Sequence, residues 1–314
     1  MLETLLFSVS VTAPIFVWIL IGSVLRSVGL LGERVVGHLS QFVFYVSLPV
    51  LMFFGALRRP LAEVFDFGMT LVGVVSTLVV WGASILLVRS SKLSAAESSV
   101  VQQGALRGNL GIVGISLCFN AYGAEALVRA SMLMALLTVV YNLLCVYIFV
   151  SGRSEERLSL FQLVVSILKN PLIVAVALGL PLGLLGVKVP EKVLYGVDTF
   201  VALTLPLALI AIGASLNFKA VANNLGQLTQ VGILKLVLAP LAAVTGGLML
   251  GYRGMDLGVM FLLLASPTAT ASFVMAKAYG ANHVLAANIV VYTTMLSLLS
   301  VSVGVFMLTV FELM

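Results

Sequence analysis

Long apolar stretches, separated by short polar segments, follow one another along this chain of 314 residues. A helix needs about 20 apolar residues to cross a hydrocarbon core of about 30 Å. Ten stretches meet this requirement, at residues 5–28, 36–57, 68–88, 97–121, 125–150, 163–186, 195–217, 227–250, 257–279 and 285–311. The pattern predicts an all-α integral membrane protein with ten transmembrane helices.

The composition agrees with a membrane protein and disfavours other classes. Charged residues are 9% of the chain and hydrophobic residues 61%, against about 25% and about 45–50% in globular domains. His38 and His283 lie near span ends and no HExxH motif is present, so no enzyme activity is expected. Cys118 and Cys145 lie inside spans without CxxC spacing, so neither a metal nor another cofactor is expected. No basic patch is interleaved with aromatic residues, so no nucleic-acid partner is expected.

The chain repeats itself at an offset of 157 residues, half its length. Three marks share this offset: Pro14 and Pro171, Leu48-Pro49 and Leu205-Pro206, and Ala121-Tyr122-Gly123-Ala124 and Ala278-Tyr279-Gly280-Ala281. We therefore expect a first five-helix repeat over residues 1–150, a linker over 151–162 and a second five-helix repeat over 163–314. An odd number of spans inverts the second repeat, and inverted repeats are typical of secondary transporters.

Lys and Arg are slightly more frequent in the loops after odd-numbered spans than after even-numbered ones. Because cytoplasmic loops carry an excess of these residues, we expect both termini on the outer, periplasmic side. The compact chain suits a multi-pass protein of a bacterial inner membrane.

The fourth span contains a predicted break. It opens with a capping box at Ser94 and Glu97, and it then runs into Arg107-Gly108-Asn109-Leu110-Gly111. Glycine and asparagine are poor helix formers, so this segment is expected to unwind at membrane depth. At the offset of the repeat, Asn109-Leu110-Gly111 falls on Ser266-Pro267-Thr268 in the ninth span. We predict that broken helices four and nine cross there; close packing of small residues is the alternative.

Polar side chains inside spans are costly and tend to be functional. Lys235 lies inside span eight and Arg107 stands before the break, and each is a candidate for anion binding, for coupling or for a structural contact. Tyr141, Asn142 and Thr293 are further candidates to line the pocket. Neutral oxygens that could hold a cation are available on Gln102, Gln103, Asn109 and Asn120.

Four stretches carry a resemblance to a known family: 103–114, Ala13-Pro14-Ile15-Phe16 with Gly22, 44–49 and 265–272 with Tyr279-Gly280. The chain resembles the auxin efflux carrier family, which includes bacterial malonate and malate permeases and shares a superfamily with bile acid:sodium symporters. The resemblance implies a scaffold of helices 1, 2, 6 and 7, a mobile transport domain of helices 3–5 and 8–10, homodimers through the scaffold, and elevator-like movement.

The resemblance also implies a substrate site. Asn109 matches the substrate-contacting asparagine of the family, whereas Thr268 or Thr270 stands where the plant exporters have a second asparagine. That departure favours a small carboxylate over an aromatic auxin. The expected substrate-binding residues are Gly108, Asn109, Leu110, Gly111, Ser266, Pro267, Thr268 and Thr270.

The predicted function is secondary active transport of small organic anions such as malonate or malate, driven by protons or by the membrane potential. A sodium-coupled organic-anion symporter is the main alternative, and a transporter-like ligand sensor is another.

Overall fold

The computed structural model of the chain describes residues 2–57, 65–151, 171–215 and 225–314, and every regular element in these ranges is a helix. Among the described residues, six helical segments are long and apolar enough to cross a membrane: Ser10–Ser27, Phe67–Ser90, Ala124–Ser151, Glu191–Ala214, Leu225–Met249 and His283–Val310. The prediction of an all-α, multi-pass membrane protein is confirmed. The predicted linker beyond residue 151 and the start of the predicted span 163–186 lie outside the described residues.

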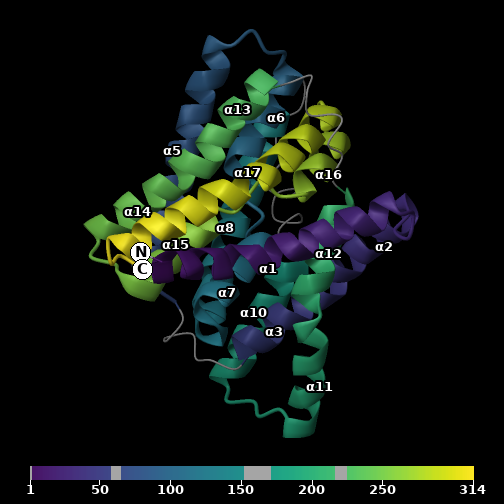
Figure 1. The fold of residues 1–314 in the computed structure, drawn as a ribbon, viewed down its shortest axis with the longest axis vertical. Helices are drawn as coiled ribbons and strands as arrows, with labels where there is room; N and C mark the ends of the chain where they lie inside the picture. The colour runs from purple at the N-terminus through teal and green to yellow at the C-terminus, as the bar shows by residue number, and fades with distance from the viewer. Residues whose placement is uncertain (1, 58–64, 152–170, 216–224) are drawn as a thin grey trace.

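One group of helices combines the two halves of the chain (Figure 1). It contains α1 (Leu2–Ser27), α2 (Glu33–Phe42), α3 (Leu48–Leu57), α10 (Pro171–Leu184), α11 (Glu191–Ala202) and α12 (Thr204–Ser215). The most extensive packing within the group joins α1 to α12 and α3 to α10, so each pair takes one helix from each half.

A second group lies on the other side of α1 in Figure 1. It contains α5 (Phe67–Ser90), α6 (Ala95–Leu106), α8 (Ala124–Ser151), α13 (Leu225–Ile233), α14 (Ala239–Met249), α15 (Gly254–Leu264), α16 (Ala271–Ala278) and α17 (His283–Val310). Here α5 packs against α14, α6 against α8 and α17 against both α13 and α16. A short helix, α7 (Ile115–Tyr122), contacts α1, α8 and α15 and thus lies between the two groups.

Glycines allow α1 and α12 to approach closely. A Cβ added at Gly22 would overlap the carbonyl oxygen of Ile210, and one added at Gly213 would overlap that of Ile19. Such contacts between small residues bring two backbones together and replace the hydrophobic effect as the force that joins helices in lipid. The contact between α1 and the second group is more polar, since the hydroxyls of Thr12 and Ser302 are 2.9 Å apart.

Two predicted spans contain a wide π-helical turn just before a proline. In the second span, η1 (Val43–Ser47) precedes Pro49, and in the eighth, η4 (Leu234–Leu238) precedes Pro240. A proline ring clashes with the carbonyl four residues earlier and lacks an N–H, so a regular α-helical turn is disfavoured there. In both spans the proline therefore accounts for the wide turn that precedes it.

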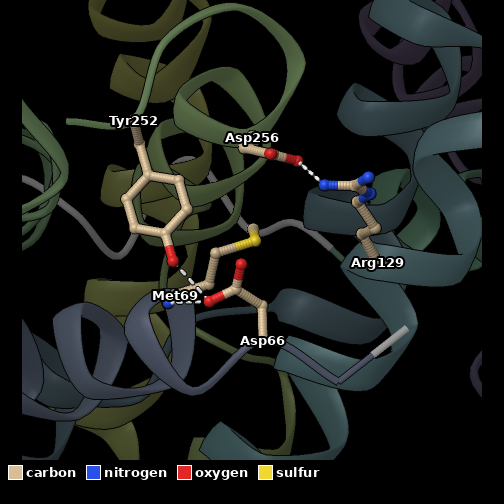
Figure 2. Close-up of polar contacts among 5 residues, drawn as sticks. All are labelled: Asp66, Met69, Arg129, Tyr252 and Asp256. Carbon is tan, nitrogen blue, oxygen red and sulfur yellow. Dashed lines mark hydrogen bonds and ion pairs between the residues drawn. The ribbon is translucent and has the colours of Figure 1, made fainter. Parts of the chain in front are cut away.

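A cluster of polar side chains ties the starts of α5 and α15 together (Figure 2). Asp66 caps α5 by accepting the backbone N–H of Met69 at 2.9 Å, and the hydroxyl of Tyr252 donates to the same carboxylate oxygen. Arg129 on α8 forms an ion pair with Asp256 on α15. Partial burial, together with the neighbouring Asp66 carboxylate, raises the pKa of Tyr252 to about 12.

Candidate functional site

Two helices break where the sequence predicts it. In the fourth predicted span, α6 ends at Leu106, and the π-helical turn η2 (Leu110–Gly114) begins after three intervening residues. In the ninth, α15 ends at Leu264 and α16 begins at Ala271. Gly108 favours the first break because glycine loses more backbone entropy in a helix than any other residue, and Pro267 favours the second because it has no N–H to donate.

The two breaks pair with each other through their backbones. Gly108 and Thr268 form an isolated antiparallel β-bridge. On either side of it, the N–H of Asn109 donates to the carbonyl of Pro267 at 2.7 Å and the N–H of Ala269 donates to the carbonyl of Arg107 at 2.9 Å. Backbone groups without a partner are very costly in the membrane interior, so each break supplies the partners that the other lacks.

Hydroxyl side chains reinforce this crossing. Thr268 is fully buried and its hydroxyl donates to the carbonyl of Gly104 on α6 at 2.7 Å, while its own N–H donates to the hydroxyl of Thr293 on α17 at 3.1 Å. The hydroxyl of Ser266 donates to the carbonyl of Leu263 at 2.6 Å. All three side chains are among those predicted to lie in the site. Thr268 joins the two broken helices, Thr293 ties the break to α17, and Ser266 bonds within the end of its own helix.

Other polar atoms at the crossing keep their hydrogen-bonding capacity. The side chain of Asn109 is 7% exposed and makes no hydrogen bond to the described residues. The side-chain oxygen of Gln103 and the hydroxyl of Tyr141 are buried and also lack a partner within the described part of the chain. Buried polar atoms without a partner are rare and call for a ligand, an ion or water. The crossing therefore offers both donors and acceptors to a bound molecule.

Arg107 points away from the backbone bridge towards α8. Its guanidinium donates to the side-chain oxygen of Asn142 at 2.8 Å and lies 3.9 Å from the sulfur of Cys145. Two predicted pocket residues thus bind each other. Because this hydrogen bond fixes the end of α6 to α8, the contact positions the break from the side.

Lys235 reaches the crossing from η4. Its side chain is 0% exposed, and its ammonium group donates to the carbonyl of Leu264, the last residue of α15, at 3.1 Å. A Cβ added at Gly108 would lie 2.8 Å from this nitrogen and 2.8 Å from the hydroxyl oxygen of Ser266. The absence of a side chain at Gly108 therefore makes room for the ammonium beside the bridge.

The remaining predicted residues take different positions. Leu110 is buried in the apolar core, Gly111 is half-buried, and Pro267 contributes its carbonyl to the bridge. Thr270 is half-buried beside the start of α16. Gln103 is not among the residues predicted to bind the substrate, yet it lies at the crossing. Its side-chain amide donates to the hydroxyl of Ser272 at 3.0 Å. An amide inside an apolar span is the signal that points to it.

The sequence model of a protein family described as "Membrane transport protein" matches residues 7–305, nearly the whole chain. The chain belongs to the membrane transport protein family. This is the auxin efflux carrier family, so the resemblance carried by residues 103–114 is confirmed. A family of membrane transport proteins agrees with the multi-pass helical fold.

Three relatives match most of their own length. A "Putative malonate transporter" of Rhizobium meliloti is 26% identical over 277 residues, which are 85% of each protein. An uncharacterized transporter of Methanothermobacter thermautotrophicus is 25% identical over 303 residues, 93% of this chain and 96% of that protein. Another, of Methanocaldococcus jannaschii, is 22% identical over 304 residues, 92% of this chain and 94% of that protein. Most of the length of this chain thus aligns with proteins that are named as transporters.

Proposed function

We propose that this protein is a secondary active transporter of small organic anions such as malonate or malate, driven by protons or by the membrane potential. The observation that carries the proposal is the bridge between two broken helices at Gly108 and Thr268, beside the Asn109 side chain, which makes no hydrogen bond within the described part of the chain. Broken helices that meet inside a membrane protein expose N–H groups and helix ends that bind substrates and ions in secondary transporters.

Within this site, a carboxylate would accept hydrogen bonds from the side-chain amide of Asn109 and approach the backbone from Gly108 to Gly111. Ser266, Pro267, Thr268 and Thr270 would form the opposite wall, with Thr268 and Thr293 holding that wall in place. Arg107 and Asn142 would act by positioning the break rather than by touching the substrate, because they already bind each other.

The malonate relative supports the choice of substrate class. Asn109 and the lysine at the crossing agree with it, since an amide N–H and an ammonium both stabilise a carboxylate. Charges on the substrate are best accommodated where helix breaks leave N–H groups and half-helix ends near the middle of the bilayer.

The architecture that fits this function has ten transmembrane helices in two inverted repeats, residues 1–150 and 163–314, joined by a linker at 151–162. Helices 1, 2, 6 and 7 would be the scaffold of an inner-membrane homodimer with both termini outside. The packing of α1 against α12 and of α3 against α10 supports this division, because each pair joins one helix of the first repeat to one helix of the second. The crossing, which lies in the other helices, would move as a unit past that scaffold.

The direct test is uptake of radiolabelled malonate and malate into proteoliposomes that contain the purified full-length protein. A pH gradient, a membrane potential and a sodium gradient are imposed separately. Saturable uptake that follows the pH gradient or the potential and ignores sodium is expected. Uptake only with sodium would replace the proposal by a sodium-coupled symporter. Binding of malonate without uptake would replace it by a ligand sensor, and neither binding nor uptake of small carboxylates would overturn it.

A further inference from the structure

Lys235 occupies an unusual place for a cation. It lies in the π-helical turn η4, in the middle of the apolar span Leu225–Met249, and its side chain is 0% exposed. Ionisable residues at membrane depth are costly and face a cavity, a partner or a substrate path. Wide helical turns recur at functional sites because they redirect one side chain out of the regular helical pattern.

The ammonium group is only partly satisfied by the protein. An ammonium has three N–H donors, and the hydrogen bond to the carbonyl of Leu264 is the one that Lys235 makes to the described residues. Charged or titratable side chains on the helices packed against η4 are Arg89, Glu97, His283 and Tyr292. Within the described ranges none of them forms an ion pair or a hydrogen bond with Lys235. A buried charge without an opposite charge is a strong demand for an anionic partner.

The free side of this ammonium faces the crossing. A Cβ at Gly108 would lie 2.8 Å from the lysine nitrogen and 2.8 Å from the Ser266 hydroxyl oxygen, so the ammonium stands directly against the backbone of the bridge. Asn109, whose side chain has no partner among the described residues, follows Gly108 in the chain. The lysine ammonium therefore lies directly beside Gly108 at the crossing, next in sequence to Asn109.

We infer that Lys235 is the counter-charge of the transported anion: its ammonium, which stands beside Gly108 at the crossing, pairs with a substrate carboxylate through the N–H donors that Leu264 does not use, and it thereby determines that the site takes anions. This inference rests on the proposed function and deepens it. Lys235 is then the residue that distinguishes a carboxylate from an uncharged molecule of the same shape, whereas Asn109 and the backbone orient it. Bidentate or charge-assisted hydrogen bonds of this kind are about twice as strong as neutral ones.

A purely structural role is the competing explanation. In that role Lys235 would only fix the end of α15 through Leu264, and its loss would weaken all ligands equally. The variant that separates the two roles is Lys235→Met, which keeps the length of the side chain and removes the charge. Replacing a buried charge by an apolar side chain of similar volume commonly preserves folding. The matched control is Lys192→Met, because Lys192 is exposed on α11.

The experiment measures binding of malonate and of its uncharged diamide to the purified full-length protein by isothermal titration, together with malonate uptake into proteoliposomes. Lys235→Met is expected to lower malonate affinity about tenfold or more and to abolish the preference for malonate over the diamide. Lys192→Met is expected to match the wild type. An equal loss for both ligands, or unchanged malonate affinity, would overturn the inference and leave the proposed function standing.

A second variant keeps the inference testable if Lys235→Met aggregates. Gly108→Ala retains the lysine but puts a methyl group 2.8 Å from its nitrogen, which forces the ammonium away from its position beside the bridge. A loss of malonate affinity of about tenfold is expected, since a buried charge pair depends steeply on its geometry. Unchanged affinity in Gly108→Ala would overturn the inference. If the wild type neither binds nor transports small carboxylates, the proposed function fails, and this inference fails with it.

Discussion

Thr268 on one broken helix donates its hydroxyl to the carbonyl of Gly104 on the other, at 2.7 Å, across 164 positions of sequence. Both groups are buried, and the same threonine pairs with Gly108 through its backbone. A single residue therefore holds the crossing by its main chain and by its side chain.

Thr268→Val removes this hydroxyl without changing the shape of the side chain. The carbonyl of Gly104 loses a buried partner, which costs about 1–3 kcal/mol. We expect a lower free energy of unfolding in detergent and weaker transport. Thr268→Ser keeps the hydroxyl and is the control. A valine variant as stable as the wild type would show that Gly104 finds another donor.

Asn109→Ala is expected to affect binding far more than folding. Because the asparagine side chain makes no hydrogen bond to the described residues, its removal should change the free energy of unfolding by about 0.5 kcal/mol or less. Malonate uptake into proteoliposomes should fall about tenfold or more, the cost of one charge-assisted hydrogen bond. The control is Gln41→Ala, at an exposed position on α2. Full uptake by Asn109→Ala would remove this residue from the proposed site.

The contact between Arg107 and Asn142 should appear as an energetic coupling. Their hydrogen bond of 2.8 Å joins the end of α6 to α8. A double-mutant cycle with Arg107→Met and Asn142→Ala should give an interaction energy of about 0.5–3 kcal/mol in thermal unfolding. Strict additivity of the two variants would contradict the contact. Malonate uptake measured on the same variants reports whether the position of the break matters for transport.

The contribution of Tyr252 to the free energy of unfolding should decrease at alkaline pH. Its pKa is raised in the folded protein to about 12, so folding favours the protonated, neutral phenol. The stabilisation is fully present below the unfolded pKa of about 10 and is lost as the pH rises through about 12. Thermal unfolding between pH 8 and 11 should show the wild type losing its advantage over Tyr252→Phe as the pH increases.

Tyr195→Phe is the control for that experiment, since Tyr195 on α11 is 78% exposed. It should follow the wild type at every pH. A constant difference between the wild type and Tyr252→Phe would show that folding does not raise the pKa of the Tyr252 phenol.

Gly213→Ala should destabilise the packing of α1 against α12. The added methyl group would overlap the backbone oxygen of Ile19, and backbone cannot move aside as a side chain can. Overpacking of this kind costs about 1–3 kcal/mol or more, so a clear drop in the melting temperature in detergent is expected.

Gly37→Ala is the matched control, because a Cβ at Gly37 in α2 meets no atom within 4 Å. That variant should be neutral or stabilising by about 0.5–1 kcal/mol through helix propensity. Equal effects of the two substitutions would argue against the close approach of α1 and α12.

The positions of the helix breaks are readable in the sequence because their causes are local. Glycines around Asn109 and the proline at 267 disfavour helical backbone whatever surrounds them, and the capping box at Ser94 and Glu97 is present as predicted. The family follows from the same stretches. The number of spans and their inverted arrangement stay predictions, because two of the proposed spans are broken and one begins outside the described residues.

A helical membrane protein of the membrane transport family, with breaks near Gly108 and Pro267, follows from the amino-acid sequence alone. The contacts of Thr268 with Gly104, of Arg107 with Asn142 and of the Lys235 ammonium with Gly108 become visible in the folded protein. Breaks depend on backbone preferences of single residues, whereas the partner of each buried polar group depends on how helices distant in sequence are rotated and packed against one another.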